Sequence, residues 1–400
     1  MAQRAQAVRG MRDIGPPEAD LRRRVANRIL DIYASYGYEV IETPALEDLA
    51  VLVGSQGGEN EKLIFKVLKR GARLEEELQP GAGPGELADL GLRFDLTVPL
   101  ARFVANHLND LPAPFKVARI ASAWRAERPQ RGRYREFPQC DIDIVGEPGI
   151  AAEIELCSAT LDVLQKLGIS GPNLRLNDRR LIRQTVERYL GSLDQPGEVY
   201  IALDKIDKIG EDSVTAELSG QGYDADDVRR LLDHMATAEL HPDNPVEADL
   251  GQILEFLRAQ GFSASFDPTL VRGIGYYTGP IFEVAHPDVP YSLAGGGRYD
   301  GMPARFGAPP LPMCGFSIGF DRVCEMVDRL LFTTGGPKIA VTCATEAELL
   351  RCLAVARERR AKEPTAAISV VRRARNLRKQ QEDLRTLGYT DIIDGAAFTS

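Results

Sequence analysis

The stretch Val117–Val145, VARIASAWRAERPQRGRYREFPQCDIDIV, predicts two strands joined by a polar loop. Val117–Trp124 is apolar and β-branched enough for a strand. Pro129 and Gly132 interrupt the chain after it. Arg135–Val145 then alternates between polar and apolar residues, as a strand does when its two faces meet different surroundings. We therefore expect an antiparallel hairpin.

The predicted hairpin separates its charges. One face of the second strand carries Phe137, Gln139, Asp141 and Asp143, and the other carries Pro138, Cys140, Ile142 and Ile144. Five arginines crowd the turn: Arg125, Arg128, Arg131, Arg133 and Arg135. Such a hairpin could hold a polyphosphate at its turn and a cationic or polar group further along. The alternative is an exposed hairpin whose charges are merely solvated.

The run RAERPQRGRYREFPQCDID resembles motif 2 of the class II aminoacyl-tRNA synthetases, in the form found in the histidyl-tRNA synthetase family. The resemblance implies an α+β fold, in which an antiparallel sheet flanked by helices forms the catalytic domain. We expect this domain at 1–170 and 266–334, a helical insertion at 171–265, and a small C-terminal α/β domain at 335–400.

The composition is that of an ordinary globular protein, with 44% hydrophobic and 27% charged residues and a net charge of −9. The negative charge argues against a generally basic nucleic-acid coat but leaves room for a local basic groove. The six cysteines form no CxxC pair, which favours reduced thiols and a cytoplasmic location. The N-terminus lacks the apolar core of a signal peptide, and no apolar run is long enough for a membrane span.

An amphipathic helix is predicted over Leu21–Tyr36, with Gly37 as its stop signal. A strand is expected to follow over Tyr38–Thr43 and to end at Pro44. This unit could be an ordinary helix–strand pair. It also resembles motif 1 of the class II enzymes, which implies that the protein forms a homodimer through it.

Residues 72–90 are polar and rich in glycine and proline, which predicts a mobile connection. A helix is expected from about Val98 to Leu108. Asp95, at the junction before that helix, needs a partner if it is buried, and it could simply cap the helix. The segment LRFDLTVPLAR resembles the family segment whose Asp-Leu-Thr contacts the amino group of the bound amino acid.

Residues 171–265 are predicted to be mainly helical. Four helices are expected there: Arg179–Leu190, Asp204–Leu218, Asp226–Ala238 and Ala248–Gln260. The resemblance implies that this insertion lies over the tRNA acceptor stem. Strands are expected to resume at Ser263–Asp267 and Thr269–Val271.

The stretch Val271–Ala285, VRGIGYYTGPIFEVA, predicts a β-type run that contains glycines, among them Gly273. Glycine inside a strand indicates that another group approaches the backbone closely. Arg272 and the two tyrosines after it could line a nucleotide or amino-acid pocket, or they could stand on the surface of a bulged strand. The run resembles the first histidine-specific motif of the family, with Gly275 where the family usually has Asp.

Two further stretches contain glycines. Leu293–Met302, LAGGGRYDGM, is predicted to be a strand and loop whose three consecutive glycines give a ligand access to backbone N–H groups. It is neither a Walker A loop nor a Rossmann turn, and it resembles the second histidine-specific motif. Cys314–Val327, CGFSIGFDRVCEMV, predicts a strand, a break at Gly319 and a helix. It resembles motif 3, with Arg322 in the first helical turn.

Residues 338–400 alternate between strands and helices, which implies a small α/β unit with a parallel sheet. Its expected elements are Ile339–Thr342, Glu346–Ala361, Ala367–Val371, Leu377–Leu387 and Asp391–Ile393. The unit is locally basic. It resembles the anticodon-binding domain of the family without the final strand and helix.

The resemblance also implies roles for individual residues. Three arginines would be catalytic: Arg272, Arg125 and Arg322. Histidine would be bound by Asp95, Leu96, Thr97, Arg125, Gln139, Asp143, Arg272, Tyr276 and Tyr277. ATP would be bound by Arg125, Glu127, Arg133 and Arg322. Mg²⁺ would bridge the ATP phosphates, and no residues stand at the spacing of a protein metal site.

Phosphate-facing arginines without a P-loop favour an adenylation site, in which positioning and charge neutralisation carry the rate. The resemblance implies ATP-dependent activation of L-histidine and transfer to tRNA(His). One alternative is a paralogue that adenylates histidine or another amino acid for a different acceptor. Another is a non-catalytic regulatory protein on the same scaffold, although the filled motif positions argue against it.

Overall fold

The computed structural model describes residues 5–53, 61–83, 85–129, 133–192, 196–272, 275–332 and 336–398. The chain divides into two compact units, Met1–Leu331 and Phe332–Ser400. Each unit contains a hydrophobic core of its own. Within the described ranges, no helix combines the length and the hydropathy that crossing a membrane requires.

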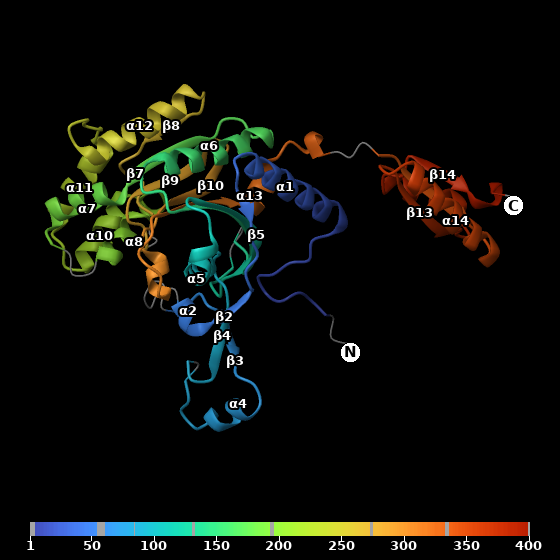
Figure 1. Ribbon diagram of the computed structural model, residues 1–400, viewed down its shortest axis with the longest axis horizontal. Coiled ribbons are helices and arrows are strands. Elements are labelled where there is room, and N and C mark those ends of the chain that lie inside the picture. Colours follow the sequence, from blue (N-terminus) through green and yellow to red (C-terminus); the bar gives the residue numbers. More distant parts are fainter. Residues whose placement is uncertain are drawn as a thin grey trace. The chain divides into compact units, whose positions relative to one another are not determined.

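An eight-stranded mixed sheet forms the centre of the first unit (Figure 1). Its strand order is β1-β5-β6-β11-β10-β9-β7-β8. The strands are β1 (Glu39–Val40), β5 (Phe115–Trp124), β6 (Glu136–Val145), β7 (Asn173–Asp178), β8 (Ala264–Phe266), β9 (Pro280–His286), β10 (Val289–Arg298) and β11 (Met313–Gly319). The outermost pairs are parallel and the inner pairs are antiparallel. The inner strands therefore form the expected antiparallel platform.

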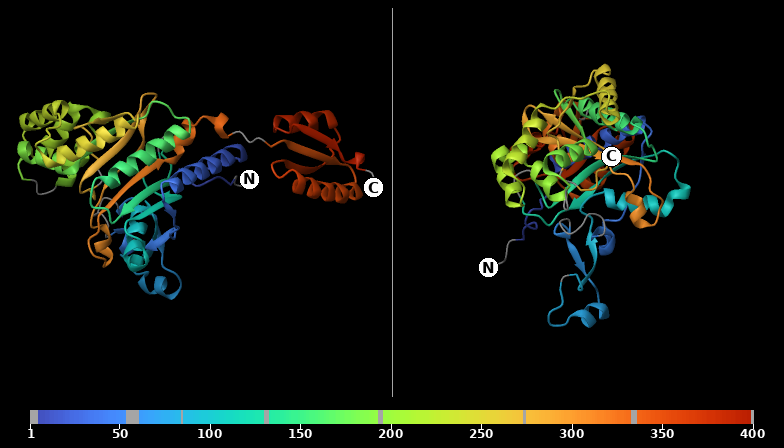
Figure 2. Two further views of the ribbon diagram at one scale, coloured as in Figure 1. Left: turned by 45° about the horizontal axis from the view of Figure 1, so that its top comes forward. Right: turned by 90° about the vertical axis from the view of Figure 1, so that its left-hand side faces the viewer.

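The predicted hairpin is confirmed. Strands β5 and β6 pair antiparallel over all 10 residues of each. The apolar side of β6 lies toward helix α6 (Ala151–Lys166), which packs on β6 and β11. Helix α1 (Pro16–Ser35) lies beside α6, and Figure 2 shows both on the same side of the sheet. The polar side of β6 is consequently turned away from these helices.

Helix α1 begins earlier than predicted but ends where expected. Gly37 follows it with a φ of +83°, which confirms the stop signal. The strand predicted over Tyr38–Thr43 is longer than the observed β1. Strand β1 lies at the edge of the sheet, and its two residues pair with Val117 and Ala118 of β5.

A second, three-stranded sheet has the order β2-β4-β3. It consists of β2 (Leu46–Asp48), β3 (Lys66–Leu68) and β4 (Ala88–Leu92), followed by α5 (Thr97–His107), and α2 (Leu49–Val53) lies between β2 and β3. The described part of the connection predicted over 72–90 contains regular structure, and its mobility stays a prediction. That segment contains α4 (Ala72–Glu77) and the start of β4, and Lys69 forms an ion pair with Glu77.

Between β7 and β8 the described residues form six helices: α7 (Arg179–Leu190), α8 (Pro196–Leu203), α9 (Ile206–Ile209), α10 (Glu211–Gly220), α11 (Ala225–Thr237) and α12 (Pro245–Ala259). Gly210, with a φ of +79°, divides the helix predicted over Asp204–Leu218 into α9 and α10. Strand β7 lies within the range 171–265, which was expected to be helical. Because β7 pairs with β9 in the central sheet, the helical segment starts only at Arg179.

The chain between β8 and β9 differs most from the prediction. Within its described residues, neither Thr269–Val271 nor the start of 271–285 is a strand, and β9 begins only at Pro280. Gly273 lies outside the described residues. The segment leaves the sheet and places Arg272 above β10, as the site below shows.

Strand β11 leads directly into α13 (Phe320–Met326), as predicted for the motif 3 segment. Four short 3-10 helices complete the described chain: η1 (Leu108–Asp110), η2 (Met302–Phe306), η3 (Arg329–Phe332) and η4 (Gly395–Ala397).

The second unit has the predicted alternation of strands and helices. Its elements are β12 (Lys338–Cys343), α14 (Glu346–Lys362), β13 (Ala367–Arg372), α15 (Leu377–Thr386) and β14 (Asp391–Asp394). The sheet order is β13-β12-β14, and both pairs are parallel. Alternating strands and helices require this arrangement, since a crossover helix returns each strand in the same direction.

Candidate active site

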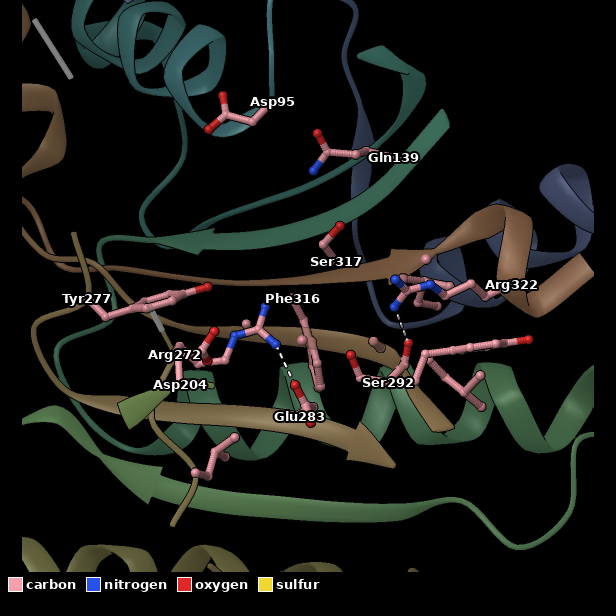
Figure 3. Close-up of a pocket in the computed structure, with 18 of the residues that line it drawn as sticks. Asp95, Gln139, Asp204, Arg272, Tyr277, Glu283, Ser292, Phe316, Ser317 and Arg322 are labelled. Carbon is pink, nitrogen blue, oxygen red and sulfur yellow. Dashed lines mark hydrogen bonds and ion pairs between the residues drawn. The ribbon is translucent and has the colours of Figure 1, made fainter. Parts of the chain in front are cut away.

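A cavity of about 1080 Å³ lies against the polar face of the hairpin. The predicted site residues that line it are Asp95, Thr97, Arg125, Glu127, Arg133, Gln139, Asp143, Arg272, Tyr276, Tyr277 and Arg322. Leu96 does not line it, and its buried carbonyl oxygen accepts a hydrogen bond from Arg119. Figure 3 shows Arg272 and Arg322 on one side of the cavity and Asp95 on the other.

One row of residues crosses six strands of the sheet on the cavity side. The cross-strand partners are, in order, Arg175 on β7, Glu283 on β9, Gly295 on β10, Ser317 on β11, Asp141 on β6 and Arg119 on β5. Residues directly opposite each other share a face of a sheet. The row therefore has charged residues at both ends and two small residues in its middle. Arg272 occupies the space above that middle.

At one end of the cavity, strands β5 and β6 and the residue Asp95 contribute three buried carboxyl groups and one buried guanidinium. Asp95, Asp141, Asp143 and Arg119 are 6%, 4%, 3% and 2% exposed. Arg119 donates from Nη2 to Oδ2 of Asp143 and from Nη1 to the carbonyl oxygen of Leu96. Arg125 also lies close enough to lower the pKa of Asp95. Three carboxyl groups beside two cations still leave this end acidic. It favours a ligand that carries positive charge or donates hydrogen bonds.

Burial raises the pKa of all three carboxyl groups. The Val98 N–H opposes this effect at Asp95, and Arg119 opposes it at Asp141 and Asp143. Burial still raises the pKa of Asp141 to about 7. A carboxyl group in this range can either accept or give a proton near neutral pH.

Two acceptor atoms at this end of the cavity have no donor among the described residues: Oδ1 of Asp141 and Oε1 of Gln139. A buried acceptor without a donor carries a cost in free energy. Because both residues line the cavity, the donor can come from a ligand.

Asp143 is held from two sides. Tyr299 donates its hydroxyl to Oδ1, and Arg119 donates to Oδ2. Gly315 stands opposite Asp143 on β11, and a β-carbon there would overlap Oδ1. A carboxylate accepts about four hydrogen bonds, so Asp143 retains capacity for a donor from the cavity.

Asp95 makes the helix-capping contact that was one of its two interpretations. Its Oδ1 accepts from the backbone N–H of Val98 at 3.1 Å, at the start of α5. Asp95 and Thr97 also line the cavity. Capping and facing the cavity are compatible, because the cap uses only one of the two carboxylate oxygens.

The residues at the turn of the hairpin bring further cations to the cavity. Arg125 donates from Nε to the carbonyl oxygen of Phe94 at 3.1 Å, and its guanidinium lies 5.0 Å from the centroid of the Phe137 ring. These contacts fix the direction of Arg125. Arg133 is exposed and lines the cavity, whereas Arg131 lies outside the described residues.

Arg322 lies near Arg133, in the first turn of α13, and the two form the cationic end of the cavity. Its Nη1 donates to the carbonyl oxygen of Ser292 at 2.7 Å, and its guanidinium lies 5.0 Å from the centroid of the Tyr291 ring. Burial lowers the pKa of Arg322, and the charge of Arg133 lowers it further. Two neighbouring cations repel each other unless an anion lies between them. This part of the cavity therefore suits a polyphosphate.

The three consecutive glycines do not have the predicted purpose. Gly295–Gly297 pairs with both β9 and β11, so the sheet occupies the backbone groups that were predicted to bind a ligand. Instead, the glycines make room for neighbours. A β-carbon on Gly295 would lie 2.5 Å from Nη1 of Arg272, and one on Gly297 would lie 2.8 Å from the Tyr277 ring.

Aromatic packing holds the loop that carries Arg272. Tyr276 packs edge-on against Tyr277 at 4.8 Å and against Tyr299 at 5.6 Å between ring centroids.

Gly275 lies in a turn and not in the predicted strand. A β-carbon on Gly275 would meet no atom within 4 Å.

Four residues of this site were not predicted as site residues: Arg119, Asp141, Glu283 and Tyr299. Two of them left a signal in the sequence. Arg119 interrupts the apolar face of a strand, and Asp141 shares the face of Gln139 and Asp143. A charged residue at a buried position requires a partner. Glu283 and Tyr299 lie in the two stretches that resemble the histidine-specific motifs, but their partners Arg175 and Asp143 are remote in the sequence.

The cavity therefore has an acidic end and a cationic end. Within the described residues, no group of three or more His, Cys, Asp or Glu side chains could hold a metal ion. The arrangement is suited to a small ligand with amino and imidazole-like donors at the acidic end, beside a polyphosphate at the cationic end.

Comparison with known proteins gives a consistent picture. The family model described as histidyl-tRNA synthetase matches residues 10–323. A histidine–tRNA ligase from Leifsonia xyli subsp. xyli is 44% identical over 366 residues, which cover 85% of this chain and 84% of that protein. A histidine–tRNA ligase from Aeropyrum pernix is 39% identical over 338 residues, which cover 80% of this chain and 74% of that protein.

Solved structures share the fold. The crystal structure of histidyl-tRNA synthetase from Nostoc sp. PCC 7120 has a TM-score of 0.74 at 24% identity, covering 97% of this chain and 90% of that one. A structure from Bacillus halodurans, described as an ATP phosphoribosyltransferase regulatory subunit/histidyl-tRNA synthetase, has a TM-score of 0.74 at 21% identity, covering 96% of each chain. At these identities the similarity concerns the fold alone.

Proposed function

Because the chain belongs to the histidyl-tRNA synthetase family, we propose that it activates L-histidine with ATP and transfers the histidyl group to tRNA(His). The observation that carries this proposal is the cavity with an acidic end and a cationic end. Histidine brings an ammonium group and an imidazole N–H, and ATP brings the polyanion. The two reactants of an adenylation thus match the two ends.

In the proposed reaction, the carboxylate of histidine attacks the α-phosphorus of ATP. A carboxylate–phosphorus bond forms, and the bond to the departing pyrophosphate breaks. Arg125 and Arg272 would hold the α-phosphate, and Arg322 would hold the γ-phosphate. A permanently charged, planar guanidinium suits the charge that develops on the phosphate oxygens. Glu127 and Arg133 would contact ATP. Mg²⁺ would enter with ATP and neutralise its phosphates.

At the acidic end, Asp143 and Tyr277 would contact the imidazole of histidine. Asp95, Thr97 and Gln139 would contact the α-amino group, with Leu96 and Tyr276 as their structural support. The Gln139 oxygen that has no donor supports this assignment. Asp141 adds a second such oxygen, which the family resemblance did not point to.

The partners of the proposed enzyme follow from its parts. We propose that the unit Phe332–Ser400, with its cluster of basic residues, contacts tRNA. We also propose a homodimer through the edge strand β1, where Val40 is 56% exposed and nearby Leu46 is 42% exposed. All six cysteines are free and buried, which supports a reducing compartment such as the cytoplasm.

Amino-acid-dependent ATP–pyrophosphate exchange across all twenty amino acids tests the proposal. We expect exchange with histidine alone, and formation of histidyl-tRNA when tRNA(His) is added. Arg272→Ala should lower the exchange by several kcal/mol of transition-state stabilisation, to a rate that is still measurable, and keep the fold. Exchange with histidine but no charging of tRNA would support an enzyme with another acceptor. No exchange with any amino acid would contradict the adenylation reaction.

A further inference from the structure

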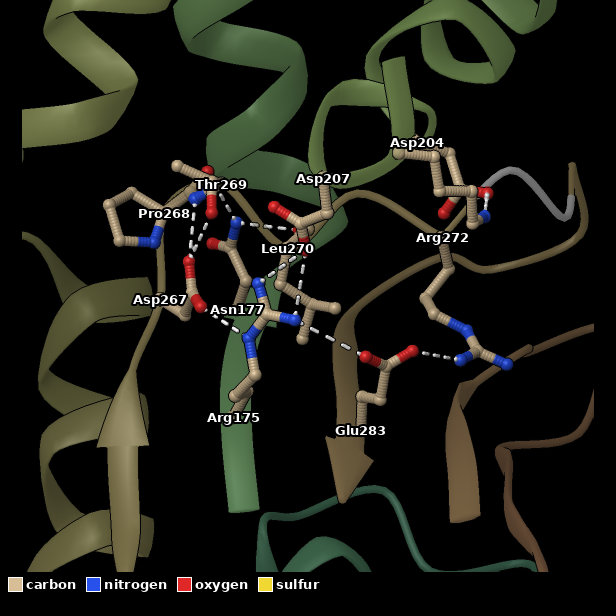
Figure 4. A network of polar contacts seen from close by, with 11 residues as sticks. Arg175, Asn177, Asp204, Asp207, Asp267, Pro268, Thr269, Leu270, Arg272 and Glu283 are labelled. Carbon is tan, nitrogen blue, oxygen red and sulfur yellow. Dashed lines mark hydrogen bonds and ion pairs between the residues drawn. The ribbon is translucent and has the colours of Figure 1, made fainter. Parts of the chain in front are cut away.

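A chain of ion pairs leads from Arg272 away from the cavity (Figure 4). Arg272 donates from Nη1 to Oε2 of Glu283 at 2.8 Å. The other oxygen of Glu283 accepts from Nη1 of Arg175 at 3.3 Å. Arg175 is held in turn by Asp267, at 2.5 Å from its Nε, and by Asp207 of α9, at 3.2 Å from its Nη2.

The sheet places the members of this chain. Arg175 and Glu283 are direct cross-strand partners on β7 and β9, and Glu283 is the partner of Gly295 on β10. Arg272 comes from a loop and lies over Gly295, where a β-carbon would be 2.5–2.8 Å from its guanidinium. The sheet thus holds Glu283 from one side, and Glu283 holds the guanidinium of Arg272 through the ion pair at Nη1.

From this geometry we infer that Glu283 and Arg175 are positioning residues, which hold Arg272 in the orientation that the reacting phosphate requires. The inference rests on the proposed adenylation. Glu283 supplies the orientation, because it takes one N–H of the guanidinium and leaves the other donors for a ligand. It does so at a point only 19% exposed, beside the site of a polyanion.

Arg175 explains how a carboxylate is tolerated there. An unpaired Glu283 would repel the phosphate that Arg272 has to bind. Arg175 neutralises Glu283 from the side away from Arg272, and two further carboxylates fix Arg175 in place. The Glu283–Arg175 pair is neutral by itself, whereas Asp267 and Asp207 bring two negative charges that contact Arg175. Since Asp207 belongs to the helical segment, the same chain ties that segment to the site.

The test measures histidine-dependent ATP–pyrophosphate exchange for Glu283→Ala and Arg175→Met. Because a misplacement of about 1 Å can lower a rate by about 100-fold, we expect kcat to fall about 10- to 100-fold, with the KM for histidine changed less than about threefold. Glu283→Gln keeps the shape of the side chain and an acceptor oxygen. Its kcat should therefore lie between those of Glu283→Ala and wild type. Asp207→Asn should change kcat less than about threefold, since Asp267 and Glu283 still hold Arg175.

A double variant separates positioning from a merely structural role. If Glu283 acts through Arg272, adding Glu283→Ala to Arg272→Ala should cause no further loss of activity. Glu187→Ala is the matched control, because Glu187 forms an exposed ion pair with Arg183 on α7. Thermal unfolding shows whether each variant is folded.

Three outcomes would overturn the inference. The first is an unchanged kcat in folded Glu283→Ala and Glu283→Gln, and the second is an effect confined to the KM for histidine. The third is additive losses of activity in the double variant. Wild-type protein without any exchange would contradict the proposed function instead. Calorimetric titration with ATP then decides the inference separately. Glu283→Ala should weaken ATP binding only when Arg272 is present.

Discussion

Gly295 and Arg272 are complementary in shape. The guanidinium lies against the backbone of β10 at the one position where a β-carbon would be 2.5 Å from Nη1. Central strands seldom contain glycine, because it is costly there and packs nothing. The absence of a side chain at residue 295 therefore has a specific use, which is to let an arginine from a remote loop reach the middle of the sheet.

Replacing Gly295 by alanine should move Arg272. Since the β-carbon would overlap the guanidinium, we expect kcat for histidine-dependent exchange to fall by about 100-fold. The change should affect kcat more than the KM for histidine. Gly251→Ala is the control, because a β-carbon there meets nothing within 4 Å in α12, and alanine should add about 1 kcal/mol to stability. Full activity in Gly295→Ala would contradict the placement of Arg272.

Arg119 should be essential for the fold as well as for the site. Arg119→Met leaves Asp141 and Asp143 buried without their cation, and breaking a buried pair in this way costs about 3–5 kcal/mol. Chemical denaturation measures the loss. Arg119→Met combined with Asp143→Asn should recover part of it, because one uncompensated charge is removed. Arg183→Met, in a pair 69% and 40% exposed, should cost less than about 1 kcal/mol.

Asp141 should make stability depend on pH. Its carboxyl has a pKa of 3.8 when unfolded and about 7 in the folded protein. Between these values the folded state binds more protons than the unfolded state, so this residue lowers the free energy of unfolding as the pH rises from about 4 to about 7. The full effect is about 4 kcal/mol, because each pKa unit corresponds to about 1.4 kcal/mol.

The comparison of wild type with Asp141→Asn checks this prediction. Denaturant unfolding at several pH values should show the stability of wild type falling relative to the variant up to about pH 7. Parallel curves for the two proteins would mean that Asp141 does not titrate in this range. Asp20 is a suitable control position, since hydrogen bonds from Arg24 and Arg23 lower its pKa and Asp20→Asn should leave the slope near neutral pH unchanged.

The two units should be separable in function. Residues 1–331 contain the cavity and their own core, so a chain ending at Leu331 should retain ATP–pyrophosphate exchange. If the unit 332–400 contacts tRNA, its removal should raise the KM for tRNA by about tenfold or more, since each lost phosphate contact weakens binding. An unchanged KM for tRNA would assign tRNA recognition to the first unit alone.

The sequence by itself determined the local structure and the family. The alternation over 135–145 predicted the hairpin and its polar face, and the order of elements after residue 338 predicted the parallel sheet. These patterns are local, because they reflect how one strand or helix meets an apolar and a polar side. The motif residues could likewise be recognised without knowing where they meet in space.

The tertiary structure alone decided how the motifs meet. Arg175 and Glu283 are 108 residues apart, and neither belongs to a segment that marks the other as its partner. The strand register brings them together and places Gly295 beside them. The loop at Arg272 was predicted to be a strand, because its glycines were interpreted as strand positions that another group approaches closely. Only the tertiary structure shows that this segment leaves the sheet. Register depends on the packing of the whole sheet, and no single segment contains that information.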